Sequence, residues 1–487
     1  MRARLYLLML VIMLGAAVFV GYRYFDELSQ YLNAALVVQS DPDDSFLAPA
    51  TGGELTAGRE IGLALGSGDV LFAAYRAAVN NGIFVQQIND VPPMVQNGLS
   101  PDLNTDPGNA SGGPDIALDE DNQAPQVAYV VYRKEDPNNN HEVRKIDISG
   151  SPPTTFAGTN ALILGAGSGA EPTIAVRSGG AEVLVVYGAG GGPGAGVAGP
   201  LDLVRFDGNL ANNNNPLGVS GGANVTLRPD IVIDDANDRA YVVFVDDDGV
   251  LWIAQVDISP AITEDPTLVA TVSVAGDDAA TSRPSARLYN SFLLVTYTQE
   301  NAGAGTDELS LLRLPLIPDI AGTQPTVIRN VGSNVVSPSI VVDTSSTPDY
   351  AHIVYGNIND PDQGDGSPLL NAIRVDLSSF SGFSDEVQDL AGEGMVTTLE
   401  TVFDPASGNI YSLFEEFGGG APDLTKTNVF VAPLSTESPA SSGEIDVVLS
   451  DALIASFDEV LTDVDDGDMV LYSNWRGFIP CDTSDSA

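Results

Sequence analysis

The chain is short of cysteine, histidine and lysine, and each shortage excludes a kind of chemistry. Cys481 is the only cysteine among 487 residues, so no internal disulfide can form. The two histidines, His141 and His352, lie far apart in the sequence, which argues against a zinc site or a Ser-His-Asp triad. Basic residues number 20 against 66 acidic ones, giving a net charge of −46. Such a charge repels nucleic acid and anionic lipid headgroups, so we expect no nucleic-acid partner.

Helical patterning is also scarce beyond the first forty residues. The 50 glycines and 31 prolines suit a structure made of strands and tight turns. With 44% hydrophobic residues, the chain is long enough to bury a large core. These features favour an all-β protein.

A two-strand phrase recurs along the chain. Its first strand begins at a proline and ends at an aspartate, and its second strand is rich in Val and Tyr. Self-similarity at such a period indicates a repeat architecture. The clearest copies are Pro114–Asp119 with Ala128–Tyr132, Pro229–Asp234 with Ala240–Phe244, and Pro338–Asp343 with Ala351–Tyr355.

The copies are evenly spaced. Weaker starts at 59–65, 399–404 and 458–463 extend the series at both ends. Each interval has room for four strands, and a proline can begin a strand without costing a ladder bond. The anchor prolines, which follow one another at intervals of 54 to 58 residues, are Pro114, Pro172, Pro229, Pro284 and Pro338.

Four antiparallel strands per repeat predict a β-propeller of seven or eight four-stranded blades. An open β-solenoid is the alternative, although its coils are usually shorter. The last repeat, starting at residue 458, is truncated. We therefore expect residues 35–56 to supply its missing outer strand and to close the ring.

The amino end differs from the rest. An apolar run from Leu5 to Val20 follows Arg2 and Arg4, and it is close to the roughly 20 residues that span a bilayer. We expect an uncleaved anchor with its amino end in the cytoplasm, because positive residues stay on that side. The alternative is a signal peptide that is cleaved, which would leave the protein secreted.

Three segments follow from this pattern. Residues 1–38 are predicted to form one hydrophobic anchor helix with an amphipathic extension, and 39–58 read as a linker or ring-closing strand. Residues 59–487 are predicted to form the propeller. This arrangement places the propeller at the cell surface, in a periplasm or outside the cell.

One loop resembles a known motif. The stretch Val245-Asp-Asp-Asp-Gly-Val-Leu-Trp252 is similar to the Ser-x-Asp-x-Gly-x-Thr-Trp turn of the sialidase-like, Asp-box propellers. It matches at Asp247, Gly249 and Trp252, and it departs from the motif at the Ser and Thr positions. It also joins the second and third expected strands, whereas the family's box usually joins the third and fourth. The resemblance implies a propeller; the box itself is structural, so it does not locate catalysis.

Three arginines precede the first strands of their repeats: Arg59, Arg228 and Arg283. If they converge at the ring axis, they could bind a carboxylate, as the substrate-binding arginines of a sialidase would. The alternative is that they neutralise neighbouring aspartates in a very acidic ring. No nucleophile and base can be placed beside them, which favours this alternative and leaves us expecting no catalytic residues.

Acidic loops are candidates for calcium, the one cofactor that the sequence suggests. Their carboxylates alternate within tight turns, but none has the full spacing of an EF-hand. Solvated turns are the alternative, because Asp is a common turn residue. The candidate ligands are Asp246, Asp247, Asp248, Asp360, Asp362, Asp365, Asp463, Asp465, Asp466 and Asp468.

Together these features predict a membrane-tethered, extracytoplasmic propeller that binds other surface proteins or glycans, or serves as a scaffold, without catalysis. Two alternatives stay open. One is a glycosidase or lyase of the sialidase-like class, suggested by the strand phrase and the arginines. The other is a structural subunit of a surface assembly or filament, driven by the amino-terminal helix.

Overall fold

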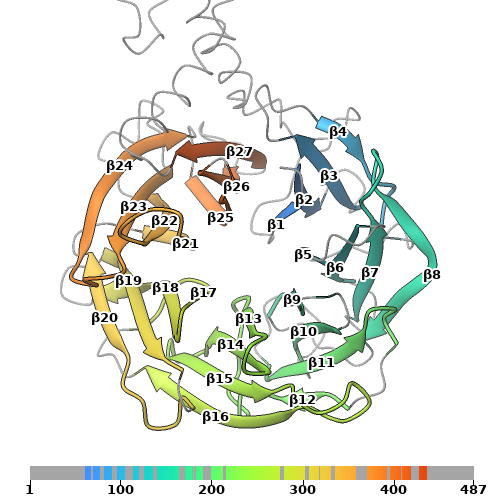
Figure 1. Ribbon diagram of the computed structural model, residues 1–487, viewed down its shortest axis with the longest axis horizontal. Helices are drawn as coiled ribbons and strands as arrows, with labels where there is room; N and C mark the ends of the chain where they lie inside the picture. Colours follow the sequence, from blue (N-terminus) through green and yellow to red (C-terminus); the bar gives the residue numbers. More distant parts are fainter. Residues whose placement is uncertain are drawn as a thin grey trace, which may run out of the picture.

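The computed structural model describes residues 61–435, with gaps mainly between strands; the longest gaps are 105–112, 190–198, 358–369 and 418–426. The described residues form only strands, turns and bends, and the sheets stand around a central axis (Figure 1). Within these residues no helix has the length and apolar character needed to cross a membrane. The apolar run 5–20 and the linker 39–58 lie outside the described residues.

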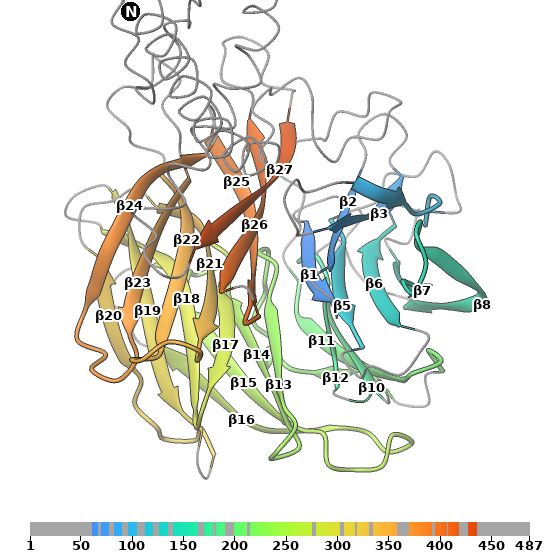
Figure 2. The same ribbon diagram turned by 45° about the horizontal axis from the view of Figure 1, so that its top comes forward.

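Each sheet is built in chain order from the axis outward, and every neighbouring pair is antiparallel. Figure 2 shows the inner strands facing the centre of the ring. The innermost strands are β1 (Gly62–Gly66), β5 (Asp115–Leu118), β9 (Thr173–Val176), β13 (Asp230–Asp234), β17 (Ser285–Tyr289), β21 (Val335–Asp343) and β25 (Met395–Asp404). The second strands are β2 (Val70–Arg76), β6 (Val127–Arg133), β10 (Glu182–Gly188), β14 (Arg239–Val245), β18 (Phe292–Asn301), β22 (Tyr350–Asn357) and β26 (Asn409–Phe417).

The outermost strands vary most in length, from two residues in β12 to ten in β8. The third strands are β3 (Ile83–Asn89), β7 (His141–Asp147), β11 (Leu201–Asp207), β15 (Leu251–Asp257), β19 (Thr306–Pro315), β23 (Leu370–Asp376) and β27 (Thr427–Ser435). The outermost strands are β4 (Gln96–Leu99), β8 (Thr154–Ile163), β12 (Leu217–Gly218), β16 (Thr267–Val274), β20 (Thr326–Asn330) and β24 (Phe383–Ala391).

The propeller prediction is confirmed, but its blade number is wrong. Among the described residues, six blades, not seven or eight, have four strands, and β25, β26 and β27 add a three-stranded sheet. The inner strand β25 packs against both β21 and β1, so this sheet closes the ring and leaves no gap for another blade. The weak repeat start at 458–463, and the residues 35–56 expected to complete it, lie outside the described residues.

The second strands form the core between sheets. Every residue of β6 and of β10 is buried, as the nearly continuous apolar and aromatic sequence of these strands indicates for strands with both faces covered. The apolar clusters join one blade to the next: Phe72 and Val85 of the first blade pack with Ile116 and Val130 of the second. Blade-on-blade burial of this kind is the main stabilising term in a propeller.

Several of the described aspartates are turn residues. Asp234, Asp343 and Asp404 end inner strands, and each carboxylate accepts a backbone N–H two or three residues on. Asp147 and Asp257 do the same at the ends of third strands. At these positions the aspartates therefore serve as turn residues, because the carboxylate takes the place of a backbone acceptor.

Gly62 tests how closely the inner strands approach. A β-carbon at this position would lie 2.9 Å from the backbone nitrogen of Ile116 in the next blade, closer than real β-carbons come. We predict that Gly62→Ala lowers the free energy of unfolding by about 1–3 kcal/mol, because two backbones must separate. Chemical denaturation of the purified protein measures this loss.

Gly218→Ala is the matched control. A β-carbon there meets the Asp202 carboxylate at 3.7 Å, an ordinary contact. Its stability should stay within about 0.5 kcal/mol of the parent. Equal effects of the two substitutions would contradict the close approach at Gly62.

Candidate functional site at the ring axis

One residue of every inner strand occupies an equivalent position beside the axis. Each pairs with the residue directly before an aromatic residue of the second strand, such as Tyr132 in β6 or Phe244 in β14. The equivalence follows from the strand register alone. We call these seven residues the axial set: Gly62, Asp115, Thr173, Asp230, Ser285, Ser339 and Glu400.

The axial set joins neighbouring sheets by hydrogen bonds. The carboxylate of Asp115 accepts the Ile174 backbone N–H at 2.9 Å and the Thr173 hydroxyl at 2.8 Å. The bond from a backbone N–H to a side-chain oxygen of the neighbouring inner strand recurs around the ring, with a carboxylate or a hydroxyl as acceptor. It joins Asp230 to the amide of Ala286 at 2.7 Å, Ser285 to Ile340 at 3.3 Å, and Ser339 to Thr401 at 3.1 Å.

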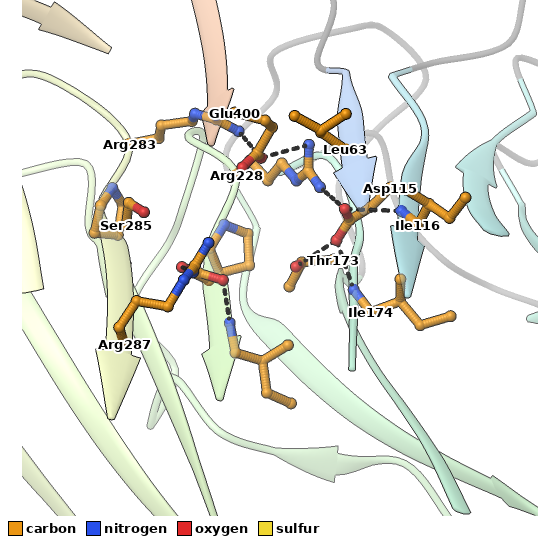
Figure 3. Close-up of a pocket in the computed structure, with 14 residues that line it drawn as sticks. Leu63, Asp115, Ile116, Thr173, Ile174, Arg228, Arg283, Ser285, Arg287 and Glu400 are labelled. Carbon is orange, nitrogen blue, oxygen red and sulfur yellow. Dashed lines mark hydrogen bonds and ion pairs between the residues drawn. The ribbon is translucent and has the colours of Figure 1, made fainter. Parts of the chain in front are cut away.

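Two arginines extend across the axis from the residues that precede β13 and β17 (Figure 3). Arg228 donates to the carbonyl of Ile61 at 2.8 Å and pairs with Asp115 at 2.5 Å. Arg283 pairs with Glu400 at 2.9 Å and also donates to the carbonyl of Leu399. These contacts join residues more than a hundred positions apart in the sequence.

The cluster is close to charge balance. Arg228, Arg283 and Arg287 face Asp115, Asp230 and Glu400 around a cavity of ≈ 130 Å³. The side chains of Arg228 and Arg283 are only 3% and 8% exposed, so their charges require partners. Burial raises the pKa of Glu400, and the two guanidinium groups oppose that shift. Burial likewise raises the pKa of Asp230.

This geometry bears on both interpretations of the arginines. Arg228 and Arg283 do converge at the axis, as the sequence suggested, but Asp115 and Glu400 already occupy their guanidinium groups. They neutralise neighbouring carboxylates and connect distant sheets. Arg59 lies outside the described residues, so the structure does not place it with them.

Sequence reasoning missed the acidic half of the cluster. A usable signal existed for two of its members, since Asp115 and Asp230 each directly follow an anchor proline. Glu400 follows no proline, because its repeat is one of the weak copies. Only the strand register identifies it as the equivalent residue.

A larger chamber adjoins the charged cavity on the axis. Its volume is ≈ 670 Å³, and it is lined by residues of all seven inner strands or the turns that follow them. Of the 18 described residues that line it, only Arg287, Thr344 and Thr401 are polar; the others are Ala, Ile, Leu, Phe, Pro or Val. Arg287, Leu63, Ile174 and Ile231 line both spaces. The charged cluster thus stands at one end of a chamber whose lining side chains are mostly apolar.

The loop that resembles an Asp box joins β14 to β15, as predicted, but a different aspartate performs the structural role. Asp246, not Asp247, accepts the indole N–H of Trp252 at 2.7 Å. Asp246 also accepts the backbone N–H groups of Asp248 and Val250. The carboxylate is fully used in holding the turn, which is why the loop keeps its shape despite lacking the motif's Ser and Thr.

The same loop gives no support to a calcium site. Within the residues that the structure describes, no three acidic, histidine or cysteine side chains are grouped as metal ligands would be. Asp246 is engaged by the turn, and Asp247 accepts from the Asn224 amide at 3.3 Å. The other candidates lie outside the described residues, where calcium stays a prediction: Asp360, Asp362, Asp365, Asp463, Asp465, Asp466 and Asp468.

No protein-family model and no curated protein sequence matches the chain. Similar solved structures include a GH43 β-1,3-galactosidase, with 8% identity over 57% of this chain and 93% of that one, at a TM-score of 0.35. A Hadza microbial sialidase shares 11% identity over 78% of this chain and 66% of its own, at a TM-score of 0.38. Aleuria aurantia lectin in complex with Fucα1-6GlcNAc shares 11% identity over 68% and 96%, at 0.38. These similarities are too low to transfer an activity.

Arg228 provides a test of the axial cluster. We predict that Arg228→Gln lowers the free energy of unfolding by about 3 kcal/mol or more at neutral pH, because it leaves Asp115 buried without its counterion. Denaturant titrations of the variant and the parent at neutral pH measure this loss.

Arg239→Gln is the control for this test. Arg239 pairs with Asp257, but both side chains are at least a quarter exposed, unlike Arg228. Exposed pairs contribute little, so the expected loss is under about 1 kcal/mol. A loss at Arg228 no larger than that at Arg239 would refute the role assigned to the cluster.

Proposed function

We propose that this protein is a non-catalytic binding module that receives a partner in its axial chamber. The observation that carries the proposal is the division of the axis into two parts. The charged groups at one end are engaged with one another, whereas the adjoining chamber has room for a ligand and few polar side chains. Pockets of 300–1,000 Å³ with mainly apolar walls and a few polar groups are typical ligand sites.

The chemistry of the chamber favours a protein ligand over a glycan. A sugar presents many hydroxyl groups, and the side chains that could bond them are Arg287, Thr344 and Thr401 among the described lining residues. Phe403 is the one aromatic in that lining. Apolar side chains of a protein segment suit these walls better, so glycans are the second ligand class.

Catalysis is the competing proposal, and two acidic groups favour testing it. Glu400 and Asp230 line the same cavity, and burial raises the pKa of each, a feature often found at catalytic sites. A glycosidase, however, needs one carboxyl free to protonate and another to attack or to activate water. Here Glu400 pairs with Arg283, and Asp230 accepts the Ala286 amide.

The decisive measurement is turnover by the full chain on fluorogenic sialosides and uronides, alongside a glycan array. We predict no hydrolysis above the buffer rate, and no difference between the parent and Glu400→Gln. Hydrolysis by the parent that Glu400→Gln abolishes would replace the binding proposal with an enzyme. Glycan-array binding without hydrolysis would keep the binding function and change the ligand class.

The location proposed for this function rests on the amino-terminal sequence. Arg2 and Arg4 before the apolar run 5–20 favour an anchored chain with the propeller outside the cytoplasm. We predict that protease added to intact cells of the native host digests the propeller, while a cytoplasmic marker survives. Protection of both until the cells are lysed would contradict this location.

A further inference from the structure

The walls of the chamber present strand edges as well as side chains. Among the described residues, each inner strand is the terminal strand of its sheet, and only one of its edges pairs with another described strand. The other edge faces the axis (Figure 1). Unpaired edges of this kind are templates for an added strand.

The axis-facing edges already bind donors from across the ring. Carbonyl groups at the edges of β1 and β25 accept from arginine side chains: Ile61 from Arg228, Leu399 from Arg283 and Thr401 from Arg287. Backbone groups on this side are therefore oriented toward the axis, where they form hydrogen bonds to side chains. A peptide can pair with the backbone of such an edge, whereas an alkyl chain offers it no hydrogen bond.

Arg287 makes one end of the chamber positively charged. It is the one charged side chain among the described lining residues of the chamber, and about a third of it is exposed. Its guanidinium donates to the neutral carbonyls of Ala286 at 2.7 Å and Thr401 at 3.3 Å. Its acidic neighbour, Asp230, is 3.7 Å away, and that carboxylate also accepts the Ala286 amide. The cation is thus only loosely compensated, and it can accept a further carboxylate.

The dimensions suit a short extended segment. The inner strands β1 and β13 are each five residues long. A parallel or antiparallel strand rises about 3.3 Å per residue, so a peptide of about five residues matches them in length. Side chains of such a peptide would meet Ala, Val and Leu on the surrounding inner strands.

We propose that the chamber binds the carboxyl-terminal tail of a partner protein. The tail is an apolar, extended stretch of about five residues, matched to the strand length. It pairs with an axis-facing strand edge and places its terminal carboxylate on Arg287. This inference rests on the proposed binding function and names the kind of partner that it serves.

The experiment uses the full chain and fluorescein-labelled acetyl-capped peptides of sequence Ala-Val-Ala-Val-Leu, with the label on an amino-terminal linker. Fluorescence anisotropy compares the free acid, the carboxyl-terminal amide and an N-methylated free acid. The free acid should bind roughly tenfold more tightly than the amide, as expected for one charge-assisted contact. The N-methylated peptide should bind more weakly, because it cannot pair with a strand edge.

Three variants locate the site. Arg287→Gln should abolish the preference for the free acid, while Arg239→Gln, the same change on a surface arginine, should keep it. Thr344→Trp should weaken every peptide, because Thr344 is an exposed residue that lines the chamber. Thermal denaturation shows whether each variant is folded. If Arg287→Gln does not fold, the inference is tested by Thr344→Trp and by the ratio of free-acid to amide affinity in the parent protein.

Several results would overturn the inference. These are no binding at millimolar peptide, equal affinity for acid and amide, or full affinity in Thr344→Trp. Displacement of the peptide by dodecanoate, combined with equal binding of the N-methylated form, would assign the chamber to a lipid instead. Glycoside turnover, measured separately, decides whether the non-catalytic proposal itself fails, so the two failures are distinguishable.

Discussion

The structure depends on how seven inner strands are joined where they crowd together at the axis. Each sheet is held in the ring by blade-on-blade packing, but packing between apolar faces has little directional preference. The axial set adds direction, because a side chain of one inner strand accepts the backbone amide of the next. The small residue Gly62 lets the backbone of β1 approach β5 without a side chain between them.

The charged cluster is a consequence of that crowding. Asp115, Asp230 and Glu400 take part in the axial set, and burial makes their negative charges costly. Arg228 and Arg283 supply the compensating charge from the residues just before β13 and β17, and they bond to sheets on the other side of the axis. A protein with few basic residues thus places three of its arginines where uncompensated carboxylates would be least tolerated.

The same arrangement separates the charged groups that hold the ring together from the chamber proposed to bind a partner. Once the carboxylates and guanidinium groups are paired, the space beside them is bounded mainly by apolar side chains and by strand edges. Arg287 stands at the boundary, since it lines both spaces and its contacts are mostly to neutral carbonyl groups. The function proposed for the chamber follows from this boundary and not from the loops that the acidic composition first draws attention to.

The sequence by itself determined the repeat, the all-β character, the fully covered second strands and the use of aspartate in turns, because each is a local pattern read within a few residues. It also suggested that Arg228 and Arg283 could meet at the axis, because each precedes the first strand of its repeat. Only the tertiary structure decided the number of blades, since ring closure depends on β25 meeting β1. It alone paired Arg283 with Glu400, 117 residues away, and gave Asp246 the role expected of Asp247. Such contacts depend on how the repeats close in space, which no local pattern records.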